Sequence, residues 1–268
     1  MERLSRGDAE AVIKAYAREG RVHVAKTHAD ALQRLVSDWA ENGGIKLPKD
    51  HAILACTNFE VRQLNDMAQQ ERLKAGALNR CSAVTVGDET FYGGDRVFFT
   101  KKSRKLHLEN GDAGTIVGIR NNPLSAAVTV RVDGEREARE IPLRTLLRTD
   151  YDGLTRGYAS TVHKMQSKGV DHTHCLLSGG MTDREITYVS LSRHRKSVHI
   201  YTDENHAGVA LTRLALEATG ERRRLKAKPG LSEDFSPLIS QAAKSNAKTL
   251  ATDQQCHGQL TITHEQRH

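Results

Sequence analysis

The residues best suited to chemistry in this chain are two arginines, Arg193 and Arg195. They close the run Tyr188-Val-Ser-Leu-Ser-Arg-His-Arg195, just after a helix that we expect from Thr182 to Leu191. A guanidinium in the turn after a helix can reach a nucleotide that another domain holds, and can neutralise the charge that develops during phosphoryl transfer. The alternative is that both arginines form surface ion pairs, as isolated arginines usually do.

A second polar group follows a predicted strand, Tyr158 to Val162. Its members carry hydroxyl, imidazole, amine and amide groups, and they are Thr161, His163, Lys164 and Gln166. Open α/β sheets bind ligands at the carboxyl ends of their strands, so this position favours a ligand-binding loop. The alternative is that Thr161 and His163 cap the next helix.

A third group is a basic loop between two predicted strands. It contains Lys101, Lys102, Arg104, Lys105 and His107. The whole chain carries 40 Lys and Arg against 33 Asp and Glu, a net charge of +7, which favours a polyanionic partner such as nucleic acid. The alternative is a solvated charged hairpin without a ligand.

Three other patterns do not lead to a site. No Gly-x-x-x-x-Gly-Lys-Ser/Thr loop for phosphates occurs in the 268 residues. Val198–Glu204 has the form of a buried strand with two acids at its end, and without that loop we interpret it as a structural strand. His172 and His174 share one face of a strand with no second ligand pair nearby, so we expect no metal site.

Composition places the chain in a class of protein. The 4 cysteines are widely spread and form no Cys-x-x-Cys pair, which favours reduced thiols. No apolar run approaches the roughly 18 residues that span a bilayer, and the first residues lack the apolar core of a signal peptide. We expect a cytoplasmic protein without a membrane partner.

The spacing of apolar residues predicts α/β segments at the start of the chain. Helices are expected over Asp8–Arg18, from an N-cap at Thr27 to Asn42–Gly44, and after a capping box at Thr57. Arg21–Ala25 and Ala52–Cys56 are expected strands, and the second is apolar enough to be buried on both faces of a parallel sheet. Trp39 lies on the apolar stripe of its helix, so we expect it in the core.

The middle of the chain has a different character. Five short β-rich runs separated by turn residues predict a small barrel over residues 83–150. The α/β pattern returns over residues 151–219, with strands at Tyr158–Val162, His174–Ser178 and Val198–Tyr201 and helices at Thr182–Leu191 and about Ala207–Ala218. Residues 1–82 and 151–219 therefore form one α/β domain around an insertion, and residues 220–268 form a basic, flexible tail.

Four stretches of this sequence resemble a known family. Gly157-Tyr-Ala-Ser-Thr-Val-His-Lys-Met-Gln166 resembles motif V of RecD-like superfamily 1 helicases, and Tyr188–Arg195 resembles motif VI. The similarity is closest to the helicase part of conjugative relaxases of the TraA/TraI/TrwC type. Ala55–Asn65 and Gly94–Gly114 also resemble that family, and the resemblance extends over about residues 1–205.

The resemblance implies a fold and roles for residues. The fold would be a RecA-like, P-loop NTPase-type parallel sheet with an inserted SH3-like barrel. Arg193 would be the arginine finger, with Arg195 as a weaker candidate, and Gln166 would connect the motif V loop to the nucleotide. Single-stranded DNA would contact Thr161, His163 and Lys164, and the barrel residues Lys101, Lys102 and Arg104. Ser167 stands where the family has a glycine, which removes backbone freedom from that loop.

The family's nucleotide-binding half is not found in this sequence. We therefore expect ATP and Mg²⁺ to bind only where a P-loop domain of the same or a neighbouring polypeptide completes the site, and we expect the isolated chain to be inactive. The chain would be a fragment of a larger enzyme, a split subunit or a gene remnant. The competing hypothesis is a non-catalytic module that binds single-stranded DNA.

Overall fold

The computed structural model describes residues 9–86, 88–121, 126–142, 153–161, 169–177 and 194–207. The chain divides into two compact units, Met1–Arg223 and Arg224–His268, and all described residues belong to the first. The expected helix at Thr182–Leu191 and the predicted tail lie outside the described residues, as does all but the start of the helix expected near Ala207–Ala218.

A five-stranded parallel sheet forms the base of the described unit. Its strand order is β1 (Val22–Ala25), β12 (His194–Asp203), β11 (Val170–Leu176), β2 (His51–Ala55) and β10 (Ala159–Thr161). All four neighbouring pairs are parallel. This arrangement confirms the predicted α/β architecture with a parallel sheet.

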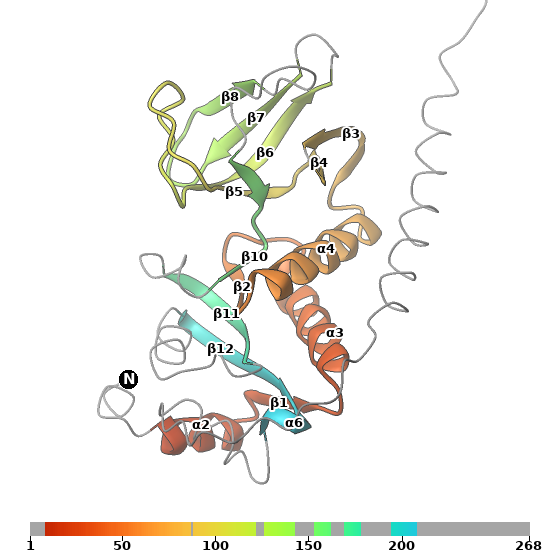
Figure 1. Cartoon of the computed structure of the whole chain (residues 1–268), viewed down its shortest axis with the longest axis vertical. Helices are drawn as coiled ribbons and strands as arrows, with labels where there is room; N and C mark the ends of the chain where they lie inside the picture. Colours follow the sequence, from red (N-terminus) through yellow and green to blue (C-terminus); the bar gives the residue numbers. More distant parts are fainter. Residues whose placement is uncertain are drawn as a thin grey trace, which may run out of the picture. The chain divides into compact units, whose positions relative to one another are not determined.

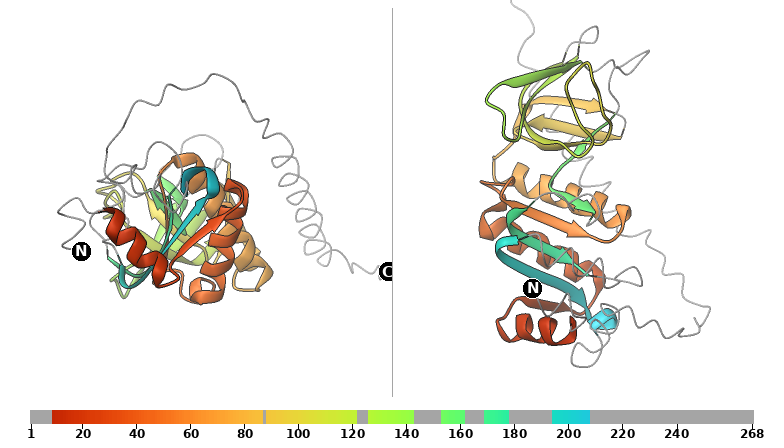
Figure 2. Two further views of the ribbon diagram at one scale, coloured as in Figure 1. Left: turned by 90° about the horizontal axis from the view of Figure 1, so that it is seen from below. Right: turned by 90° about the vertical axis from the view of Figure 1, so that its left-hand side faces the viewer.

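Helices cover both faces of this sheet (Figures 1 and 2). Ile13 of α2 (Ala9–Arg18) packs on one face, against a cluster that includes Leu54 and Ile200. On the opposite face, α3 (His28–Trp39) and α4 (Asn58–Lys74) pack on a cluster that includes Ile53 and Tyr201. Consecutive residues of β2 and β12 thus enter different cores, because side chains alternate along a strand. The continuous apolar runs in the sequence follow from this double burial.

Both predicted helix starts on the α3 and α4 face are confirmed. Thr27 and Thr57 each accept a hydrogen bond from a backbone N–H three residues on, at 3.1 Å, and the acidic side chain at that position bonds back to the cap. Helix α3 continues into a π-helical turn, η1 (Ala40–Gly44), in which Gly43 adopts a φ of 114°. Trp39 is fully buried, as expected, and its indole Nε1 donates to the carbonyl oxygen of His51 at 3.0 Å.

The inserted segment forms antiparallel strands. A hairpin pairs β3 (Asn79–Val86) with β4 (Glu89–Gly93), and a five-stranded sheet has the order β8 (Ala138–Pro142), β7 (Ala127–Val132), β6 (Ala113–Arg120), β5 (Arg96–Phe99) and β9 (Leu154–Arg156). A separate apolar cluster with Phe91, Phe99, Ile116 and Val130 lies beneath these strands.

Two strands of this region were missed in the sequence. Strand β4 buries the adjacent residues Phe91 and Tyr92, so it lacks the alternation that identifies a half-buried strand. Strand β9 lies beyond residue 150, where we expected the insertion to end, and it pairs antiparallel with β5 through Val97 and Arg156. Three residues carry too little pattern to show which sheet they join, and only the pairing decides it.

The described helices are short. The longest, α4, has 17 residues, and none of the described helices combines the length and the apolar character that a membrane span requires.

Candidate functional site

Thr161 is the predicted DNA-contacting residue that the structure places at a strand end. It is the last residue of β10 and pairs with Ala55 at the end of β2, two residues before the cap of α4. The side chain therefore lies at the carboxyl edge of the parallel sheet, where ligands bind in this architecture. His163, Lys164 and Gln166 lie outside the described residues, so their roles remain predictions.

Arg195 lies at the opposite edge of the same sheet. It is the second residue of β12, and His194 beside it pairs with Val170 at the start of β11. The Arg195 side chain is 69% exposed, with Nη1 3.8 Å from Asp171 Oδ1. Lys196 Nζ lies 2.7 Å from Asp171 Oδ2, and this hydrogen bond lowers the pKa of the Asp171 carboxyl. Arg193, the predicted arginine finger, lies outside the described residues.

A pocket of about 470 Å³ connects Arg195 to residues of the antiparallel sheet. Its charged lining residues are Lys49, Arg96, Asp112, Asp133 and Arg195. Arg96 is nearly buried and forms a two-pronged ion pair with Asp133, in which Nη1 donates to Oδ1 at 2.6 Å. Lys49 and Arg96 were not predicted as site residues. The run Gly94-Asp-Arg-Val97 was the signal that pointed to Arg96, but only the fold brings it near Arg195.

The basic loop between β5 and β6 is well anchored. Leu108 is buried in the core of the antiparallel sheet, and Ser103 and Leu108 exchange backbone hydrogen bonds of 2.9 and 3.0 Å. Arg139 of β8 donates to the carbonyl oxygens of Leu106 and His107. This loop presents Lys101, Lys102 and Arg104 as exposed side chains, and Lys102 Nζ also pairs with Glu109 at 2.7 Å. The positive side chains thus share a surface held by the strands beneath.

Histidines form a stacked row across the parallel sheet. We define the histidine row as His23, His199, His174, His51 and His172, whose neighbouring rings lie 4.4 to 6.2 Å apart. The prediction that His172 and His174 share a face is confirmed, and the other members come from β1, β2 and β12. Burial lowers the pKa of His174 to about 3 and, less strongly, the pKa values of His23, His51 and His199.

Neighbouring rings of the row are stacked, with interplanar angles of 12° to 29°. Within the described part of the chain, no group of three or more His, Cys, Asp or Glu side chains is arranged to hold a metal ion. At the other end of β12, Asp203 accepts hydrogen bonds from the backbone N–H of His206 at 3.1 Å and pairs with its ring Nδ1 at 2.7 Å. Val198–Asp203 lies in β12, as predicted, whereas Glu204 begins a short helix, α6 (Glu204–Ala207). The structural role of the two acids stays a prediction.

Sequence comparison confirms the resemblance to conjugative transfer proteins. The chain is 32% identical over 200 residues to the conjugal transfer protein TraA of Rhizobium radiobacter and to that of Agrobacterium fabrum. It is a homologue of TraA. The matched region covers 74% of this chain and 17% of each TraA protein, so the chain spans about one sixth of the length of these relatives. No protein-family model matches it.

A more distant relative is the RecD subunit of a RecBCD enzyme. This TraA homologue is 26% identical over 235 residues to the RecBCD enzyme subunit RecD of Mycolicibacterium smegmatis. The matched region covers 82% of this chain and 40% of RecD. Among solved structures, Bacteroides Pif1 bound to single-stranded DNA matches 84% of the chain at 15% identity, with a TM-score of 0.41 and 55% of Pif1 covered.

Proposed function

We propose that this chain acts as the second RecA-like domain of an ATP-driven DNA helicase in conjugative transfer. The antiparallel strands would be its inserted SH3-like barrel. The observation that carries the proposal is the identity of 32% with TraA over 200 residues. The sequence similarity to RecD is a second observation that supports a helicase-type function on DNA.

Two features, the exposed basic loop and the half-buried Thr161, are suited to single-stranded DNA. The basic loop offers Lys101, Lys102 and Arg104 on an anchored hairpin, and the carboxyl edge of the parallel sheet offers Thr161. Cationic side chains bind phosphates and release counterions, whereas hydroxyl groups hydrogen-bond to the backbone of the strand. In our proposal His163 and Lys164 continue the contact from β10.

ATP would be hydrolysed only in an assembly with a P-loop domain, which would hold the phosphates and Mg²⁺. Arg193 would then neutralise the charge on the transferred phosphoryl group, and Gln166 would connect the nucleotide to the DNA-contacting loop. We assign Arg195 a lesser role, because its guanidinium already lies beside Asp171 at the amino edge of the sheet.

Salt-dependent binding of the full chain to an oligothymidylate tests the DNA proposal. For Lys101→Gln/Lys102→Gln/Arg104→Gln, we expect weaker binding and a slope of log K against log salt that is smaller by up to about 2, at about 0.7 per lost phosphate contact. The matched control is Lys46→Gln/Lys74→Gln/Arg120→Gln, which removes the same charge from exposed positions elsewhere. An equal effect of both triple variants would show that only net charge matters and would contradict the proposal.

The second candidate function is a non-catalytic module for single-stranded DNA. The anchored basic loop favours it, because this loop requires no nucleotide to present its charges. Binding that depends only on the basic loop would support this module. Binding that is also lost when residues 162–168 are replaced by a glycine-serine loop would support the helicase domain.

A further inference from the structure

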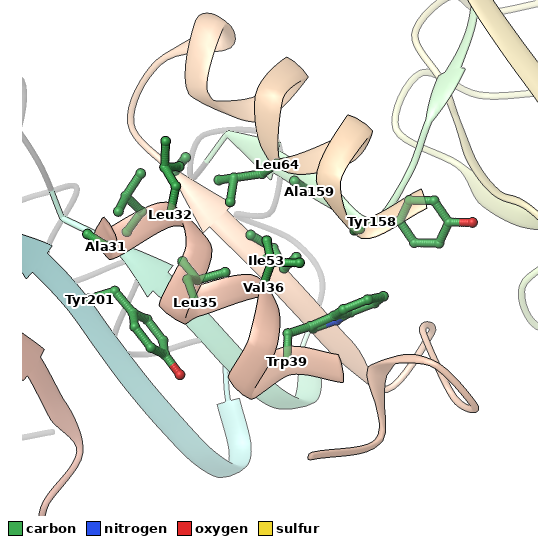
Figure 3. Packing of buried hydrophobic residues seen from close by; sticks show 13 residues of the cluster. Ala31, Leu32, Leu35, Val36, Trp39, Ile53, Leu64, Tyr158, Ala159 and Tyr201 are labelled. Carbon is green, nitrogen blue, oxygen red and sulfur yellow. The ribbon is translucent and has the colours of Figure 1, made fainter. Parts of the chain in front are cut away.

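The Tyr158 ring lies in the core of the parallel sheet, whereas its hydroxyl reaches the turn between β4 and β5. The ring is 2% exposed and belongs to the apolar cluster of α3 and α4, edge-on to Trp39 at 5.9 Å between centroids. Figure 3 shows the hydroxyl oxygen directed away from that cluster. This hydroxyl donates a hydrogen bond to Asp95, in the turn between β4 and β5. One side chain therefore links the parallel sheet to the antiparallel strands.

Asp95 is a fully buried carboxylate that accepts hydrogen bonds from three segments of the chain. Besides Tyr158, it accepts hydrogen bonds from Gln69 Nε2 of α4 and from the backbone N–H of Tyr92, both at 2.7 Å. Arg72 of α4 donates to the carbonyl oxygen of Gly94 at 2.7 Å and to the hydroxyl of Tyr158 at 3.0 Å. Burial raises the pKa of Asp95, whereas these hydrogen bonds and the charge of Arg72 oppose that rise.

Asn65 holds the backbone on both sides of the Tyr158 side chain. Its Oδ1 accepts from the N–H groups of Tyr158 and Ala159 at 2.9 Å each, and its Nδ2 donates to the carbonyl oxygen of Ala159 at 3.2 Å. The preceding residue, Gly157, donates its backbone N–H to the carbonyl oxygen of Arg96 in β5 at 2.8 Å. The chain is thus fixed at the point where it passes from β9 into β10.

The contact between the parallel sheet and the antiparallel strands at Tyr158 and Asp95 consists of buried hydrogen bonds. Apolar packing is non-directional and tolerates sliding, whereas buried hydrogen bonds are satisfied in a single geometry, and an unsatisfied buried carboxylate is costly. Three stretches that resemble the helicase family converge here, through Asn65, through Asp95 and through Tyr158. Their convergence on buried hydrogen bonds indicates a positioning role.

We propose that Asn65, Arg72, Asp95 and Tyr158 form a rigid joint that makes the antiparallel sheet and β10 move as one body. The joint would hold the basic loop at a fixed separation from Thr161 at the end of β10. Its consequence for DNA rests on the function proposed above: a long single strand that touches both surfaces would bind more tightly than one that touches a single surface.

Hydrogen exchange of the full chain, measured peptide by peptide, tests the joint itself. Tyr158→Phe removes one hydroxyl and keeps the ring. We expect amides of β5, β6 and β10 to exchange roughly ten- to a hundredfold faster, since a buried acceptor loses its donor, while β11 and β12 are unchanged. Tyr201→Phe is the matched control, because it removes another buried hydroxyl of the same cluster, one that donates to Asp38 at 3.1 Å. It should leave the antiparallel strands unaffected.

Asn65→Ala tests the same joint from α4 and should give the same pattern. Uniformly faster exchange across both sheets, or no change in the antiparallel strands, would overturn the joint. For DNA, we expect Tyr158→Phe to weaken binding of a long oligothymidylate several-fold and to spare a short one. Equal loss for both lengths would overturn the positioning role. If the unsubstituted chain binds no DNA, the proposed function fails, and the exchange data still decide the joint.

Discussion

The buried imidazole of His174 gives a prediction about stability against pH. His174 is 1% exposed, and burial followed by the nearby rings of His199 and His51 lowers its pKa from 6.5 to about 3. The native state therefore binds this proton more weakly than the unfolded state does. The contribution to stability is complete above pH 6.5 and is lost progressively as the pH falls towards 3. At pH 4.5 the loss is about 2.7 kcal/mol, from two pH units at about 1.36 kcal/mol each.

Urea unfolding of the chain and of His174→Gln, from pH 7 to pH 4.5, measures this loss. Glutamine stays neutral, so the free energy of unfolding of the variant should fall by about 2.7 kcal/mol less over this range than that of the unsubstituted chain. His107→Asn is the matched control, because His107 is exposed on the basic loop and has a φ of 50° that asparagine tolerates. If His174→Gln loses stability with pH as steeply as the unsubstituted chain, the reasoning is refuted.

Two further predictions concern backbone approach and catalysis. A Cβ at Gly157 would lie 2.7 Å from the carbonyl carbon of Val97, so Gly157→Ala should lower the free energy of unfolding by about 1–3 kcal/mol; Gly118→Ala, whose Cβ would meet ordinary contacts at 3.5 Å, should change it by less than about 1 kcal/mol in urea titrations. In an assembly that includes a P-loop domain, Arg193→Ala should slow ATP turnover about a thousandfold or more while affinity for single-stranded DNA is kept. Arg195→Ala should slow ATP turnover much less, because that side chain lies beside Asp171. Equal losses of turnover for the two arginines would contradict the assignment of Arg193 as the arginine finger.

The parts of the fold that depend on neighbouring residues were predictable. The N-cap at Thr27 and the capping box at Thr57 need only residues three positions apart, and both form as expected. The apolar run in β2 predicted a strand buried on both faces, because double burial removes the alternation of polar residues. Thr161 was expected at the end of a strand because a predicted strand, Tyr158–Val162, gives way there to a run of polar residues.

The parts that depend on distant partners were not predictable. Strand β9 contains only three residues, and its antiparallel pairing with β5 is a contact between segments far apart in the chain. The histidine row gathers residues from four strands, so the sequence showed only the pair His172 and His174. Likewise, the sequence placed Arg195 near a nucleotide without showing that it lies at the opposite edge of the sheet from Thr161.

The sequence by itself determined the parallel α/β architecture, the helix starts and the kinship with TraA, because apolar periodicity, caps and identity are read along the chain. The tertiary structure alone decided what several quoted motif residues do. In the sequence, Asp95 and Tyr158 were recognised only as parts of two motifs. In the fold they form a buried hydrogen bond, although they lie 63 positions apart in the sequence. The physical reason is that burial and hydrogen-bond geometry are properties of chain segments that meet in space, and a linear pattern contains neither.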